Sequence, residues 1–148
     1  MRKNFFCTIL VFTVTFLSCK DCDEENNPIA GCTDSRALNS NFNAVQDDGS
    51  CIYSNATFYA SASTFNGIPI VRVDVNVNGN NLGSTNGTFF PSGPGNCSVP
   101  GTIPFQFQNG ENIDWNATVI LATGATIITS GTARPSSISN CIKVNITK

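Results

Sequence analysis

The chain has 148 residues, of which 12% are charged and 41% hydrophobic, and its formal net charge is −2. This length provides about one ordinary domain, since domains typically run to roughly 100 to 150 residues. The sparse charge excludes a nucleic-acid binder with a broad basic face, and the absence of histidine excludes Ser-His-Asp and Cys-His catalysis and imidazole metal sites.

Residues 1–18 are predicted to be a lipoprotein signal peptide. Arg2 and Lys3 give a positive start, and residues 5–17 form an uncharged, mostly apolar run that falls short of the ~20 residues needed for a membrane span. The sequence FLSC at residues 16–19 then resembles the lipobox of bacterial lipoproteins, although its first two residues depart from the usual ones. The resemblance implies that Cys19 receives the lipid and becomes the mature start. An ordinary secreted protein cleaved nearby is the alternative.

Residues 19–30 are predicted to be an acidic tether. The run KDCDEE at residues 20–25 resembles the signal that sends some bacterial lipoproteins to the outer face of the outer membrane. A solvated linker is the plainer interpretation, and both can hold at once. The expected location is therefore the outer membrane, with the protein lipid-anchored and exposed at the cell surface.

Seven cysteines are present, and five remain once one is assigned to the leader and one to the lipid. Export places these five in an oxidising setting. Cys22 is left over, and it could pair with another protein, stay reduced or exchange with Cys32. Zinc is less favoured because histidine is absent and lipidation accounts for the cysteine three residues before Cys22. The spacing favours two internal disulfide bonds, Cys32–Cys51 and Cys97–Cys141.

Residues 31–53 resemble a short cysteine-framed repeat of bacterial surface proteins. The segment keeps GCTD at its start and DDGSC near its end, and it departs from the repeat at Ser35 and Ser40, where proline and tyrosine are usual. The segment has too few apolar residues to fold by burial alone. A disulfide closing about twenty residues would supply ~3 kcal/mol in the chain-entropy model.

The same segment is rich in side-chain oxygens of the kind that calcium prefers. A calcium ion is the one cofactor considered, although the EF-hand pattern is absent. Asp and Asn also dominate turns, where they cap the backbone locally, and this structural interpretation is favoured. The candidate ligands are Asp34, Asn39, Asn41, Asp47 and Asp48.

Residues 55–148 are predicted to form a single antiparallel β-sandwich of about seven strands. Valines at positions 71, 73, 75 and 77 alternate with polar residues, which predicts one buried and one solvated face. Asn78 to Asn81 are expected to form the following turn, with the return strand starting at Leu82. Further strands are predicted at residues 57–64, 102–108, 113–121, 126–133 and 141–147.

The order of motifs in this part resembles the prealbumin-like sandwiches of bacterial surface proteins, which are similar to carboxypeptidase regulatory-like modules. The motifs are VxVxVNGxxLG from residue 73, an isolated cysteine, PGTIPF, NGENIDWNA and a final CxKVxI. The resemblance implies a bond from Cys97 to Cys141 at the start of the last strand. It also implies stalk, adhesion or carbohydrate-associated roles without an active site.

These observations predict a non-catalytic surface lipoprotein that acts as a binding, adhesion or accessory module of an outer-membrane assembly. Expected partners are the membrane through the lipid, an outer-membrane protein, or further copies added at an open strand edge. The alternative is a carbohydrate-binding module that stacks sugars on Trp115 and Tyr59, although tryptophan more often belongs to a core.

An enzyme is the third and least favoured class. It would need two carboxylates across a cleft, and only Glu111 with Asp114, or Asp47 with Asp48, come near that arrangement. Adjacent acids in a turn point apart and serve the turn, so the sequence predicts no catalytic residue.

Overall fold

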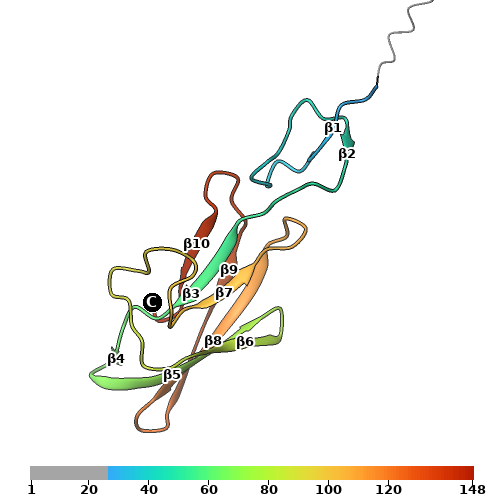
Figure 1. Ribbon diagram of the computed structural model, residues 1–148. Helices are drawn as coiled ribbons and strands as arrows, with labels where there is room; N and C mark the ends of the chain where they lie inside the picture. Colours follow the sequence, from blue (N-terminus) through green and yellow to red (C-terminus); the bar gives the residue numbers. More distant parts are fainter. Residues whose placement is uncertain (1–26) are drawn as a thin grey trace, which may run out of the picture.

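The structure is a computed structural model that describes residues 27–148; the predicted signal peptide, Cys19 and Cys22 lie outside this range. Figure 1 shows an elongated molecule, with a small module of residues 27–53 at one end and a β-sandwich at the other. Within residues 27–148, no helix has the length and apolar character needed to cross a membrane.

The small module has very little regular structure. Strand β1 (Ala30–Gly31) pairs in parallel with β2 (Gln46–Asp47), and backbone hydrogen bonds such as Leu38 N–H to the Ile52 carbonyl (2.7 Å) join its loops. Its only buried side chains are those of Cys32 and Ala37. Since so little apolar surface is buried, the disulfide must carry much of the module's stability.

The sandwich consists of two sheets. One has three strands in the order β10-β3-β7, and the other has the order β4-β5-β8-β9 with β6 also paired to β5. The strands are β3 (Asn55–Tyr59), β4 (Thr64–Phe65), β5 (Ile68–Val77), β6 (Asn80–Thr85), β7 (Ile103–Gln106), β8 (Ile113–Leu121), β9 (Thr126–Ala133) and β10 (Cys141–Asn145).

The all-β prediction with two disulfide bonds is confirmed, but the pairing is not antiparallel throughout. Strand β10 runs parallel to β3, with Cys141 opposite Asn55 and Asn145 opposite Tyr59. The reason is the connection before it: β9 belongs to the other sheet, so residues 134–140 cross between sheets instead of forming a tight hairpin. Such a crossover leaves the direction of β10 free, whereas a two-residue hairpin would force it antiparallel.

The core lies between the sheets and is built from alternating residues of the long strands. Phe58, Val73, Val75 and Ile146 are all completely buried. One predicted core residue, Val71, is instead 49% exposed.

The cause is a bulge. Ile70 pairs with Leu121 and Arg72 with Ile120, so Val71 is an extra residue with no partner on β8. A bulge shifts the alternation by one position, which turns Ile70 and Val73 inward and Val71 outward.

The β5–β6 turn is tighter than predicted. Val77 pairs with Asn80, so only Asn78 and Gly79 form the loop, and the return strand starts two residues before Leu82. Both loop residues have positive φ, 50° and 81°, which is the geometry of the type I′ turn that matches strand twist.

The strand predicted at residues 57–64 is shorter than expected. It ends at Tyr59, after which the N–H groups of Ser61 and Ala62 donate to the Thr147 hydroxyl instead of a neighbouring strand.

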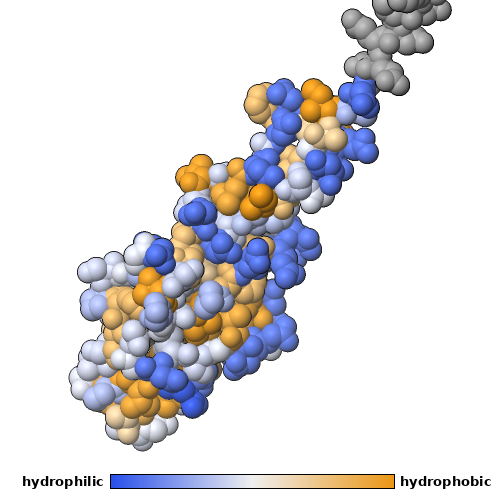
Figure 2. Space-filling view, viewed as in Figure 1, coloured by the Kyte–Doolittle hydropathy of each residue, from blue (hydrophilic) through white to orange (hydrophobic). Residues whose placement is uncertain are grey.

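The two parts of the molecule touch around Asp34. The Tyr53 hydroxyl donates to Asp34 Oδ2 at 3.0 Å. Gly110 of the sandwich lies so close that an added Cβ would be 2.5 Å from the same oxygen and 2.6 Å from Tyr53 Cε1. In Figure 2 apolar and hydrophilic residues are mixed on the small module as well as on the visible face of the sandwich, and Ile29, Phe42, Val45 and Ile52 of the module are exposed.

Candidate functional site

The most informative hollow of the sandwich lies along its open side, where β9 is the last strand of one sheet and β10 the last strand of the other. Its volume is about 540 Å³, and both predicted ligand-binding residues, Trp115 and Tyr59, line it. Ile142, Val144 and the basic residue Lys143 contribute from β10. The hollow therefore combines aromatic, aliphatic and charged groups.

Trp115 occupies the end of the core beneath this hollow. Its ring meets Phe58 edge-on, with centroids 6.0 Å apart and planes at 67°. On the neighbouring strand it is paired with Gly131, where an added Cβ would lie 2.9 Å from Cζ2 of the tryptophan. Because Gly131 has no side chain, the Trp115 ring can occupy the space next to it. Trp115 is half-buried there. The residue belongs to the core and borders the hollow at the same time.

Tyr59 borders the hollow from the face of the three-stranded sheet that points away from the core. Successive residues of a strand face opposite sides, so Tyr59 points away from its neighbour Phe58. Its ring packs edge-on against Phe90 at 6.5 Å, and its hydroxyl lies near Gly93. The two predicted aromatic residues therefore border one hollow without forming a shared flat platform.

Three basic residues of this site are not indicated by the sequence. Residues 27–148 contain five basic side chains. Arg36 and Arg72 form ion pairs with carboxylates, whereas the other three form no ion pair within 4 Å in the described part of the chain. These three, Arg134, Lys143 and Lys148, are exposed and all line the hollow.

No sequence signal links these three positions, because they lie on segments that come together only when both sheets form. Lys143 alternates with Ile142 and Val144 on β10, which does identify an outward-facing position. Arg134 directly follows β9, and its proximity to β10 depends on how the sheets close.

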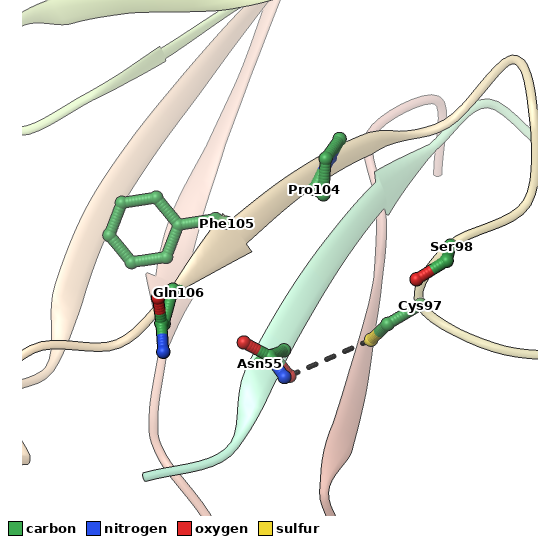
Figure 3. A pocket seen from close by; sticks show the side chains of 6 residues that line it. All are labelled: Asn55, Cys97, Ser98, Pro104, Phe105 and Gln106. Carbon is green, nitrogen blue, oxygen red and sulfur yellow. Dashed lines mark hydrogen bonds between the residues drawn. The ribbon is translucent and has the colours of Figure 1, made fainter.

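A second hollow of about 370 Å³ lies beside β7 and the loop that carries Cys97. Figure 3 shows its lining, in which Asn55 and Gln106 supply amides and Pro104 and Phe105 supply apolar surface. Cys97 Sγ lies 3.7 Å from the Asn55 carbonyl oxygen, but this sulfur is held in a disulfide and carries no hydrogen to donate. The lining contains no charged side chain, so this hollow offers less for recognition.

Both predicted disulfide bonds are confirmed. Cys32 and Cys51 are joined with their Cα atoms 4.8 Å apart, and Cys97 and Cys141 with theirs 5.5 Å apart. The second bond ties the loop after β6 to the first residue of β10, so it fixes the start of the strand that borders the main hollow.

The carboxylate of Asp34 is fully engaged in the small module. Arg36 donates to it through Nε and Nη2, both at 3.0 Å, and through its backbone N–H at 2.9 Å. These hydrogen bonds, led by that of the Arg36 side chain and joined by that of Tyr53, lower the pKa of Asp34 to about 2. Burial and the same bond to Asp34 raise the pKa of Tyr53. Asp34 therefore acts here as a structural acceptor.

The other calcium candidates also use their oxygens within the small module, and all but Asn39 do so within their own turns. Asp47 accepts from Gly49 N–H, Asp48 from Ser50 N–H and Asn41 from Asn43 N–H, each two residues ahead. These Asx-type bonds are the turn-forming interactions that the sequence also allowed. Asn39 Oδ1 accepts from Ile52 N–H at 2.7 Å.

Over residues 27–148, no group of three or more acidic or cysteine side chains is placed to hold a metal ion. Calcium binding stays a prediction.

The acidic residues considered for catalysis serve local structure as well. Asp114 accepts from the Thr132 hydroxyl at 2.8 Å. Asp74, an acid outside the two pairs, accepts from the Ser84 hydroxyl and forms an ion pair with Arg72 at 2.9 Å. Asp47 and Asp48 each close their own turn, as described above.

Comparison of the chain with protein-family models, with curated proteins and with solved structures found no match in any of the three. The resemblances to lipoproteins and to prealbumin-like sandwiches therefore stay expectations from the sequence.

Proposed function

We propose that this chain is a non-catalytic binding module held at the cell surface by a lipid on Cys19. The observation that carries the binding role is the hollow between β9 and β10, where three exposed basic side chains lie beside Trp115. The anchoring role rests on the leader and lipobox-like sequence.

The shape of the molecule supports this proposal. The described chain begins in the small module, which lies at one end of the molecule (Figure 1), so a lipid at Cys19 would sit on the module's side of the molecule. The sandwich and its hollow would then project away from the membrane, where partners can reach them. A lipid-anchored protein of the outer membrane in this orientation would serve adhesion or act as an accessory subunit.

The anchor is tested by growing cells that express the full chain with an alkyne-labelled fatty acid. We expect label on the native protein, none on Cys19→Ala, and full label on the matched control Cys22→Ala. Digestion of the protein by protease added to intact cells would report surface exposure. Label that survives in Cys19→Ala, or complete protection from protease, would contradict the proposal.

A carbohydrate-binding module is the second candidate. Trp115 favours it, because a half-buried ring held by Phe58 and Gly131 can offer a rigid apolar surface to a sugar. A glycan array with the native chain is the direct test. Capture of an outer-membrane protein with no glycan signal would favour the accessory role instead.

Association with further copies by strand addition is the remaining partner hypothesis. Among residues 27–148, strands β9 and β10 each pair on one side only, and such unpaired edges can accept another strand. Size-exclusion chromatography of the purified chain across a range of concentrations would detect it.

A further inference from the structure

We propose that the hollow between β9 and β10 binds an acidic carbohydrate chain, whose carboxylates contact Arg134, Lys143 and Lys148 while a sugar ring lies against Trp115. This proposal rests on the binding role proposed above and specifies the ligand class of the same site. It does not depend on the lipid anchor.

The distribution of charge is the first argument. Within residues 27–148, Arg36 is paired with Asp34 and Arg72 with Asp74, each at 3.0 Å or less. Every other basic side chain of these residues lines one hollow. A chain with a net negative charge thus collects its unpaired positive charge at a single place. Such a concentration attracts anions and raises their rate of association.

No acidic group of residues 27–148 forms an ion pair with the three basic side chains of the hollow. Asp114 is the acid that strand pairing places nearest, opposite Thr132 on β9, and it accepts the Thr132 hydroxyl. It forms no ion pair within 4 Å with Arg134 in the described structure. The basic groups therefore remain available to a ligand.

The apolar part of the lining is the second argument. Alternation along β10 turns Ile142 and Val144 toward the core and Lys143 and Asn145 outward. Together with Trp115, the two aliphatic residues form an apolar floor next to polar and charged groups. A simple inorganic anion has no apolar surface that could pack against these side chains. A sugar ring does, because it has apolar C–H faces as well as polar edges.

The spread of the basic groups favours a polymer over a single anion. Strand β10 advances about 3.3 Å per residue, and it stays extended beside β3 as far as Ile146, whose N–H donates to the Tyr59 carbonyl. Lys143 and Lys148 are therefore five residues apart along this segment, and Arg134 directly follows β9 of the other sheet. Repeated carboxylates along a chain can meet separated cations of this kind.

The test uses Trp115 as its own reporter, because it is the only tryptophan of the chain. The purified chain is titrated with an oligogalacturonate at low salt, and the fluorescence of Trp115 is followed. The fully methyl-esterified oligomer, which has the same rings without charge, is the matched control ligand. We expect a saturable change with the acidic oligomer and at least about tenfold weaker binding of the ester, together with weakening by salt.

The variants Arg134→Gln and Lys143→Gln are each expected to weaken binding roughly two- to fivefold, as is usual for exposed charge contacts. Arg72→Gln removes the same charge from a site outside the hollow and should bind like the native chain. Equal binding of the ester, equal weakening by Arg72→Gln, or no binding of the oligogalacturonate would overturn the proposal. So would a response only to acidic peptides or anionic lipid vesicles. All of these results are independent of fatty-acid labelling at Cys19.

Discussion

The small module should depend on its disulfide far more than the sandwich does. Only Cys32 and Ala37 are buried among its side chains, so hydrophobic burial contributes little to its stability. We predict that the double variant Cys32→Ala/Cys51→Ala unfolds residues 27–53 locally while the sandwich stays folded.

The size of the effect follows from the length of the closed loop. The bridged cysteines are 19 residues apart. Closing a loop of this size lowers the entropy of the unfolded chain, which stabilises the folded module by about 3 kcal/mol. Since each 1.4 kcal/mol is a factor of ten, the ratio of folded to unfolded module should fall by more than about a hundredfold.

Hydrogen exchange followed by mass spectrometry measures this effect. The Leu38 N–H, which donates to Ile52, and the Asn41 N–H, which donates to the Cys32 carbonyl, should exchange much faster in the variant. Amides of β8 should be unchanged. In the matched variant Cys97→Ala/Cys141→Ala, whose bond spans 44 residues, we expect the reverse pattern and a loss of about 4 kcal/mol in the sandwich. Native protection of Leu38 and Asn41 without the first disulfide would refute the reasoning.

Four further predictions concern individual contacts. Gly110→Ala should lower the unfolding free energy by about 1 to 2 kcal/mol in chemical denaturation, because φ is +61° and the new Cβ would press on Asp34; an unchanged midpoint would contradict this contact. The pKa of Asp34, about 2, lies below its value in the unfolded chain. The ionised carboxylate therefore contributes to the free energy of unfolding, by about 1 kcal/mol after allowance for solvent screening. This contribution is complete above about pH 5 and is lost as the pH falls toward about 2. The stability difference between the native chain and Asp34→Asn should shrink over that interval. Gly131→Val should displace Trp115 and shift its fluorescence to the red, with a loss of about 2 kcal/mol. Calcium should leave the melting temperature unchanged, and a rise that disappears in Asp47→Ala would establish a calcium site.

Much of the strand content follows from local pattern. Short runs rich in Val, Ile and Thr between turn residues predict strands at residues 113–121 and 126–133, and these are the observed bounds of β8 and β9. The Asn-Gly pair at residues 78 and 79 likewise determines a tight turn. The disulfide bonds also follow, since they enclose segments of distinct composition.

The features that sequence could not supply arise between strands. Val71 looks like a core residue until the pairing with β8 shows that it is the extra residue of a bulge. The parallel direction of β10 depends on a crossover between sheets. The role of Gly131 is visible only once Trp115 lies across from it. Each of these depends on a partner distant in sequence, and a local pattern carries no record of that partner.

Contacts between distant segments also fix the position of the hollow. The Cys97–Cys141 bond holds the first residue of β10, and the Thr129 hydroxyl of β9 donates to the Ile146 carbonyl just beyond its end at 2.7 Å. Strand β10 is thus fixed to its surroundings at both ends. Between these two contacts, side chains fill the space between the edges of the two sheets. Trp115 and Lys143 line the hollow in this region. A surface with both ends of its strand fixed loses little conformational entropy when a ligand binds, so weak individual contacts to exposed cations can still add up to useful affinity.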